Sequence, residues 1–383
     1  MQRTAAEEAL GLNLPTRRVE SFHYTDLRAL IQEIPEEASA TDAPKTVTPV
    51  VDSHQITFAD GRLSGEQILP SGVMLSAGAN KAGSTDINDA IVSINNAISG
   101  DAVEIVVSGN STTEKPLCIG HMSSSEASSA PYHKVTVKEN AQAQVIEQHA
   151  SAPGVSSLST VVSELILEKN SKAQWFIVQQ ESNDAKRLAR LNVKLAEGAD
   201  LSVFILNAGG KLVRQEVKVS VNGEDANLAI RGVNLVGDNA HIDVTTVLEH
   251  NVPNTNAEEL FRNVVAGDGH GIFQGQIKVA QIAQKTDAQM ACNTLLLTDD
   301  GDFSAKPELE IFADDVICAH GATVTDIDEE HLFYMRARGI GEKEARALLI
   351  KAFVDEVVEE LDADEALEEV FVGIIDSWLD VNI

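Results

Sequence analysis

A thiol and an imidazole stand two positions apart in this sequence, at Cys318 and His320, and together they are capable of chemistry. Side chains two positions apart on a β-strand point to the same face, so the sulfur and the imidazole would project side by side. Such a pair suits iron or zinc as soft ligands, and it equally suits a nucleophile with its base. Two ligands cannot hold a metal alone, so further donors must come from another chain or from residues such as Cys292 or His250. A buried thiol beside a hydrogen-bonded turn histidine is an equally open interpretation.

Other catalytic signatures are missing from the sequence. It contains no phosphate-binding Gly-x-x-x-x-Gly-Lys-Ser/Thr, no Gly-x-Ser-x-Gly and no His-Glu-x-x-His, and the glycine-rich residues 267–271 are predicted to form a tight turn between strands. No histidine pair shows zinc spacing with cysteines, and Cys118 lies in an apolar run typical of a core strand. Paired carboxylates such as Asp314 and Asp315 leave open a β-helical polysaccharide-cleaving enzyme as an alternative.

Composition narrows the classes of partner. The 383 residues include 29 Lys and Arg against 59 Asp and Glu, a net charge of −30 that disfavours nucleic acids and anionic membranes as partners. Apolar residues make up 43% of the chain, which is ample for a core. The N-terminus lacks a secretory pattern and no apolar run is long enough to span a membrane, so we expect a cytoplasmic protein. The three cysteines are therefore expected to be reduced.

Residues 53–324 are predicted to form the structural core that positions the Cys318 and His320 pair. Short runs rich in Val, Ile and Leu are broken by Gly, Asn or Asp, which is typical of strands. A weak repeat begins at four turn residues, and its alanines are 30, 26 and 27 residues apart: Asn140 with Ala143, Asn170 with Ala173, Gly198 with Ala199, and Asp225 with Ala226. A period of this length favours stacked coils of a mainly β, parallel solenoid, and a β-sandwich is the alternative.

Helical regions are predicted at both ends of the strand-rich core. Residues 1–38 show helix caps and spacing, and residues 39–52 have the composition of a linker. Residues 325–383 form a C-terminal helical domain in this prediction, with 13 acidic and 3 basic residues between Gly341 and Ile383. That acidic stretch indicates either a solvated helix face or a docking surface for a basic partner.

Five motifs carry a resemblance to a known family: Pro15-Thr16-Arg17-Arg18, Gln284-Lys285-Thr286-Asp287-Ala288, Lys306-Pro307-Glu308-Leu309-Glu310-Ile311, Cys318-Ala319-His320-Gly321-Ala322-Thr323-Val324 and Arg338-Gly339-Ile340. With these motifs the chain resembles the SufB and SufD family of iron-sulfur cluster assembly scaffold proteins over most of residues 15–361. Phe22 stands where Trp is expected, and Gly321 resembles the SufD branch rather than the SufB branch.

This resemblance implies a right-handed parallel β-helix between helical regions, and a non-enzymatic scaffold subunit. It implies that SufB binds at the β-helix, that the ATPase SufC binds at about residues 328–361, and that a transient iron-sulfur cluster forms at an inter-subunit site to which Cys318 and His320 contribute. The isolated chain would hold no tightly bound cofactor, and a homodimer of it is left open. A SufB-type paralogue that carries the cluster itself remains the nearest alternative.

Overall fold

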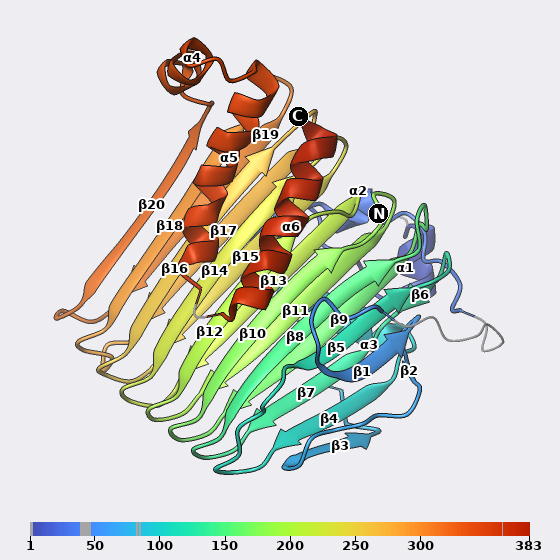
Figure 1. The fold of residues 1–383 in the computed structure, drawn as a ribbon. Helices are drawn as coiled ribbons and strands as arrows, with labels where there is room; N and C mark the ends of the chain where they lie inside the picture. Colours follow the sequence, from blue (N-terminus) through green and yellow to red (C-terminus); the bar gives the residue numbers. More distant parts are fainter. Residues whose placement is uncertain (1–2, 39–46, 82, 84–85, 362) are drawn as a thin grey trace.

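Two parallel sheets, stacked face to face, make up most of the chain in the computed structural model (Figure 1). The structure describes residues 3–38, 47–81, 83, 86–361 and 363–383, so much of the expected linker lies outside the described residues. The first sheet, here called the β20 sheet, has ten strands in the spatial order β2 (Arg62–Ser64), β1 (His54–Ala59), β5 (Leu117–Ser123), β8 (Gln142–Ser151), β10 (Lys172–Gln180), β12 (Asp200–Asn207), β14 (Asn227–Val236), β16 (Asn256–Val265), β18 (Asp287–Leu296) and β20 (Ile317–Thr325).

The second sheet, here called the β19 sheet, faces the first. Its spatial order is β19 (Asp302–Ile311), β17 (His270–Val279), β15 (His241–His250), β13 (Leu212–Val221), β11 (Lys186–Leu195), β9 (Leu158–Leu167), β7 (Tyr132–Val137), β4 (Ala102–Val107) and β3 (Val73–Ala77), with β6 (Ser128–Ser129) beside β9. From β7 onward, successive strands alternate between the two sheets, so each coil gives one strand to each sheet. The predicted parallel solenoid is therefore confirmed, and the sandwich alternative is wrong.

A column of turn residues sets the coil period. Six residues at equivalent turns adopt a positive φ between 55° and 64°: Asn140, Asn170, Gly198, Asp225, Asn254 and Lys285. Asn, Asp and Gly tolerate this left-handed conformation better than other residues, which explains why they recur in the sequence. The sequence alignment of the repeat, which placed Ala173 opposite Ala199, was partly wrong. In the structure Ala173 pairs with Leu201 of the next coil, two residues after Ala199.

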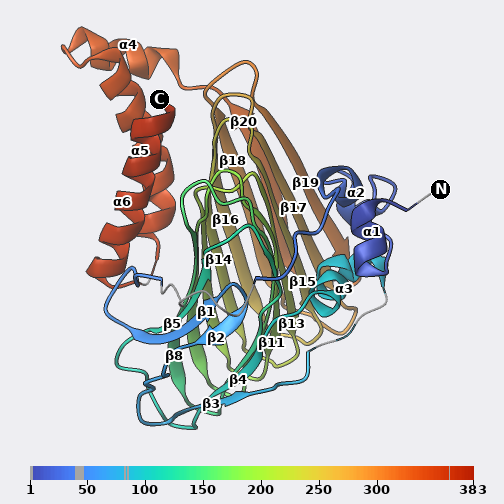
Figure 2. The same ribbon diagram turned by 90° about the vertical axis from the view of Figure 1, so that its right-hand side faces the viewer.

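The helices lie on the outer faces of the two sheets (Figure 2). They are α1 (Ala5–Leu10), η1 (Glu20–Phe22), α2 (Leu27–Leu30), η2 (Ile87–Asp89), α3 (Ala90–Ala97), α4 (Glu329–Ala337), α5 (Glu342–Glu359) and α6 (Glu365–Asn382). The strand-rich pattern did not predict α3, which packs on β9 and β11. Among the described residues, no helix is long and apolar enough to cross a membrane.

The C-terminal helices are held on the β20 sheet by apolar and ionic contacts. Phe371 of α6 is fully buried, with its ring centroid 4.7 Å from that of Phe204 on β12. Arg262 on β16 forms an ion pair with Glu356 of α5 at 2.5 Å. Burial of a Phe side chain contributes about 1.5–3 kcal/mol, so the apolar contact is the larger stabilising effect.

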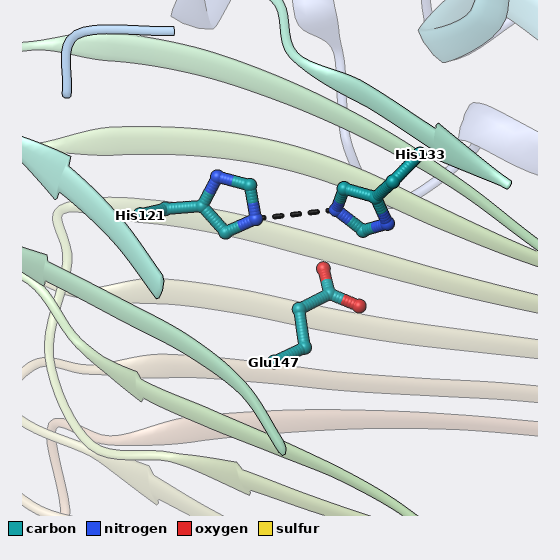
Figure 3. A group of neighbouring side chains, drawn as sticks. All are labelled: His121, His133 and Glu147. Carbon is teal, nitrogen blue, oxygen red and sulfur yellow. Dashed lines mark hydrogen bonds between the residues drawn. The ribbon is translucent and has the colours of Figure 1, made fainter. Parts of the chain in front are cut away.

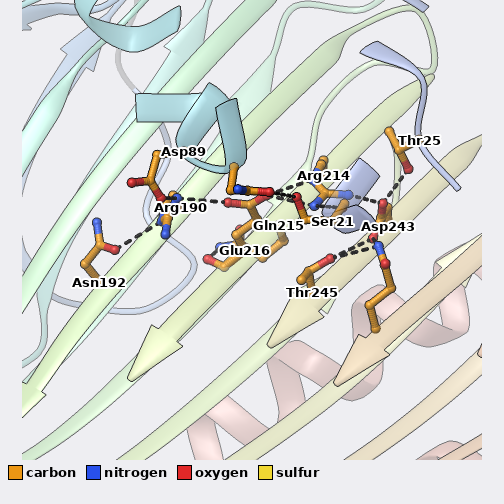
Figure 4. Close-up of polar contacts among 12 residues, drawn as sticks. Ser21, Thr25, Asp89, Arg190, Asn192, Arg214, Gln215, Glu216, Asp243 and Thr245 are labelled. Atoms are coloured by element: carbon orange, nitrogen blue, oxygen red, sulfur yellow. Dashed lines mark hydrogen bonds and ion pairs between the residues drawn. The ribbon is translucent and has the colours of Figure 1, made fainter. Parts of the chain in front are cut away.

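A buried ion pair fixes the N-terminal segment on the β19 sheet (Figure 4). The Arg214 guanidinium pairs with Asp243 and donates a hydrogen bond to the Ser21 carbonyl at 2.7 Å. It also lies over the Phe22 ring, 4.2 Å from the centroid, while the Thr25 hydroxyl donates to Asp243. The N-terminal segment thus supplies further hydrogen-bond partners to a buried charge pair that lies within the solenoid.

Candidate functional site

Cys318 and His320 lie on β20, the last strand of its sheet. The register places them at the ends of two inward-facing columns that run through the solenoid. The first column is Ala143, Ala173, Leu201, Leu228, Ala257, Ala288 and Cys318, and the second is Val145, Trp175, Val203, Ile230, Glu259, Met290 and His320. Both side chains therefore share one face, as their spacing predicts.

The last coil leaves these two side chains partly uncovered. Ala288 and Met290, their neighbours one coil earlier, are buried, whereas His320 is exposed and Cys318 is half-buried. Burial raises the pKa of the Cys318 thiol, and a hydrogen bond from the Ala288 backbone opposes this only in part. The thiol of the chain alone is consequently protonated at neutral pH, and binding a metal would have to displace that proton.

Apolar side chains surround the Cys318 and His320 pair at the open end. Phe312 is 66% exposed and Ile317 is 65% exposed, and Ile311 and Val324 are also exposed. Both β19 and β20 are edge strands, so each has a row of backbone groups without a strand partner in the described chain. Such an edge is the kind of surface that pairs with another chain.

The further ligands proposed from the sequence do not join the pair within the described chain. Cys292 is buried on β18 opposite Ala322, accepts a contact from the Asn263 amide at 3.2 Å, and burial raises its pKa to about 12. His250 ends β15 in the other sheet, where its Nδ1 lies 2.8 Å from the Thr255 hydroxyl. Both side chains therefore have structural partners of their own.

Three other sequence features have structural roles. Asp315, in the turn before β20, forms an exposed ion pair with Lys285. Cys118 is fully buried on β5, and burial raises its pKa to about 11. β17 begins at His270 after a turn in which Gly267 has φ +60°, as the predicted tight turn requires.

Gly321 is not required by the local backbone of β20. Its φ is not positive, and a Cβ atom added there would meet no atom within 4 Å in the described chain. A larger side chain could therefore occupy this position without disturbing the strand. Gly321, the residue on which the resemblance to the SufD branch depends, is therefore not required for folding.

A column of polar side chains also runs inside the solenoid, which sequence reasoning missed. In register along the β20 sheet it comprises His121, His149, Gln179, Asn207, Asn234, Asn263 and Thr294. The amide of Asn207 donates to Asn234 at 2.8 Å, and Asn234 donates to Asn263 at 2.8 Å. Stacked amides of this kind satisfy one another, so they are tolerated in the interior.

The column begins at a cluster of buried imidazoles and a carboxylate (Figure 3). His121 Nε2 lies 3.2 Å from His133 Nε2, and Glu147 lies beside both. Burial lowers the pKa of both histidines. Burial opposes ionisation of Glu147, yet the hydrogen bond from His149 and the charges of nearby histidines outweigh it and hold its pKa well below the ordinary value. The three side chains come from separate strands, so only the coil register could have revealed the cluster.

The fold and the site together define a β-solenoid protein whose last coil presents a thiol and an imidazole at an unpaired edge. A family model described as SUF system FeS cluster assembly, SufBD core domain, matches residues 121–353. The iron-sulfur cluster assembly protein SufD of Escherichia coli (strain K12) is 31% identical over 376 residues, which cover 95% of this chain and 89% of that protein. An iron-sulfur cluster assembly SufBD family protein of Synechocystis sp. is 25% identical over 393 residues, covering 94% and 87%.

A third similar protein is chloroplastic ABCI7 of Arabidopsis thaliana, which is 28% identical over 386 residues covering 93% of this chain and 81% of that protein. The three relatives match over 93–95% of this chain, whereas the family model matches residues 121–353, which make up most of the solenoid. The chain belongs to the SufB/SufD family and is a component of iron-sulfur cluster assembly.

Proposed function

We propose that this chain is a SufD-type, non-catalytic scaffold subunit that acts with SufB and the ATPase SufC. The observation that carries the proposal is the open end of the solenoid, where no further coil covers the inward-facing Cys318 and His320 side chains. Two donors cannot complete the coordination of iron, so a partner chain must supply the others. A cluster held there would be cargo shared between two chains.

SufB is proposed to pair with β19 and β20. Another solenoid end would continue the sheets by hydrogen bonding to the unpaired backbone groups, and it would cover the exposed Phe312 and Ile317 side chains. Contact there would also exclude water from Cys318 and His320. In the isolated protein, the β19 and β20 edge is proposed to pair with the same edge of a second copy, which gives a homodimer.

SufC is proposed to bind the helices α4 and α5. In α4, Phe333 is 74% exposed and Tyr334 is 59% exposed, whereas Leu332 is the buried residue of that helix. Leu348 of α5 is also exposed. Figure 1 shows α4 beyond the end of β20 and α5 over the face of the sheet, so a partner bound to these two helices would leave the length of the β20 edge accessible.

The experiment is co-expression of the tagged chain with SufB and SufC, followed by measurement of complex formation, iron and acid-labile sulfide. Cys318→Ser and His320→Ala should leave the complex intact and lower its iron and sulfide content at least tenfold. Cys118→Ser and His23→Ala, which change a buried thiol and an exposed imidazole elsewhere, should keep the cluster. A full cluster complement in both edge variants would contradict the proposed shared site.

The two docking surfaces can be separated by reciprocal variants. Phe312→Asp should lose SufB and retain SufC, because it puts a charge at the sheet edge. Phe333→Ala with Tyr334→Ala should lose SufC and retain SufB. Loss of both partners from either variant that remains folded by circular dichroism would refute the assignment of separate surfaces.

A further inference from the structure

The cluster of His121, His133 and Glu147 has the donor atoms of a metal site and is distinct from the Cys318 and His320 edge. The three residues lie on β5, β7 and β8, near the opposite end of the solenoid from β20 (Figures 1 and 3). One donor atom from each lies within 4.8 Å of the others, and all three side chains are buried. Strands from both sheets contribute, so the donors converge from two sides of the interior.

The distance between the two imidazoles suits a shared ion. The Nε2 atoms lie 3.2 Å apart and point at one another. Two nitrogen ligands of a tetrahedral Zn²⁺ at ordinary bond lengths are separated by about 3.3 Å. One oxygen of the carboxylate lies within 4.8 Å of both nitrogens and would have to move closer for all three donors to reach one ion. A fourth ligand would then complete a tetrahedral shell.

The surroundings hold these donors in place. The His121 ring is stacked between Phe58 and His149, with centroid distances of 5.2 Å and 4.6 Å. His149 lies 3.0 Å from one Glu147 oxygen, and the Trp175 ring N–H donates to the other at 3.0 Å. Partners that orient a ligating carboxylate in this way are characteristic of metal sites.

The two imidazoles use their facing Nε2 atoms on each other in the chain alone. In the neutral pair one Nε2 donates and the other accepts, whereas an ion would use the lone pairs of both. The Nδ1 atoms of the two rings have no hydrogen-bond partner in the described part of the chain, and an ion bound through Nε2 would leave them so. Arg187, a nearby cation, is paired with Glu181 at 3.5 Å and hydrogen-bonded to Gln215. It forms no ion pair with Glu147 within the described residues, although the two charges attract each other across the interior.

We propose that His121, His133 and Glu147 bind a divalent first-row transition-metal ion, Fe²⁺ or Zn²⁺, inside the first coils of the solenoid. Two imidazoles and one carboxylate suit either ion, and they do not suit Mg²⁺, which prefers a shell of oxygen ligands. The site is enclosed, so the ion would enter as the coils fold and would exchange slowly afterwards. It stabilises the first coils and does not depend on the proposed function of the β20 edge.

The test uses the full-length chain with Cys318→Ser and His320→Ala, which removes any contribution of the edge pair. The protein is produced in medium supplemented with Fe²⁺, Zn²⁺ or Mg²⁺, purified without chelator under anaerobic conditions and analysed for metal by plasma mass spectrometry. The iron or the zinc preparation should hold close to one equivalent, and the magnesium preparation should hold none. A content below a tenth of an equivalent in both would overturn the proposal.

Variants assign the ion to these donors. His121→Gln, His133→Gln and Glu147→Gln should each lower the metal content at least tenfold, whereas His250→Gln, a buried histidine with its own partner, should keep it. Unchanged content in all three variants would overturn the assignment. Should the variants fail to fold, the parent chain loaded with Co²⁺ decides: visible absorption typical of nitrogen and oxygen ligands is expected, and a spectrum of hydrated Co²⁺ would refute it.

Discussion

Glu259 is a buried carboxyl group whose replacement should stabilise the protein in a pH-dependent manner. It faces inward on β16, between Ile230 and Met290 in register, and neither carboxyl oxygen has a hydrogen-bond partner among the described residues. Burial raises its pKa from 4.5 to about 8, and the nearby Thr246 hydroxyl offsets only a part of that effect. The folded chain therefore holds a proton that the unfolded chain releases near pH 4.5.

The sign and size of the effect follow from this difference in proton binding. Below pH 4.5 both states are protonated, so Glu259 contributes no pH dependence there. Between pH 4.5 and about 8 the folded state binds the extra proton, so stability falls as pH rises. Each pH unit costs about 1.4 kcal/mol, which amounts to about 3 kcal/mol by pH 7.

Glu259→Gln removes the ionisable group and keeps the shape, so the gap in free energy of unfolding between variant and wild type should widen with pH. We expect a gap of less than about 1 kcal/mol at pH 5 and about 3 kcal/mol in favour of the variant at pH 7, measured by urea unfolding followed by circular dichroism. Glu258→Gln, on the same strand with an exposed side chain, should show no such widening. An equal Glu259→Gln gap at pH 5 and pH 8 would refute the reasoning.

Three further predictions concern the thiols, the N-terminal segment and the C-terminal helices. A maleimide reagent should label Cys318 in the native chain at least tenfold faster than the two fully buried cysteines, as read by peptide mass spectrometry, and equal rates would contradict the described burial. Arg214→Gln should lower the free energy of unfolding by about 3–5 kcal/mol, because it leaves the charge of Asp243 buried without its partner. The same variant should speed proteolysis of residues 3–38. Adding Asp243→Asn should restore part of the lost stability. Phe371→Ala should cost about 3–5 kcal/mol in urea unfolding, and a cost below 1 kcal/mol would show that α6 does not depend on this contact.

The sequence predicted the solenoid because its turns carry a local physical requirement. Asn140, Asn170, Gly198 and Asp225 all occupy left-handed turns, and such residues can be recognised one at a time without knowledge of the fold. The alanines failed as markers because any small or branched apolar residue fills an inward position, so Leu201 replaces alanine in the column that contains Ala173.

The candidate sites differ in how far sequence reasoning could reach. Cys318 and His320 lie on one strand, so the period of two along a strand was sufficient to predict a shared face. His121, His133 and Glu147 lie on three strands from both sheets, and their convergence depends on the register and on the distance between the sheets. Neither quantity follows from a single sequence, because each depends on how whole coils stack.

The two ends of the solenoid differ in a way that bears on function. At the N-terminal end the chain folds back on itself, since β2 pairs antiparallel with β1 and β3 pairs antiparallel with β4. At the other end β19 and β20 stay parallel to their neighbours, and no described strand covers them. A solenoid that needed only stability would protect both edges. The unprotected edge is also the one that presents Cys318 and His320, and this coincidence is the reason for proposing a partner that pairs with the edge and completes the ligand set.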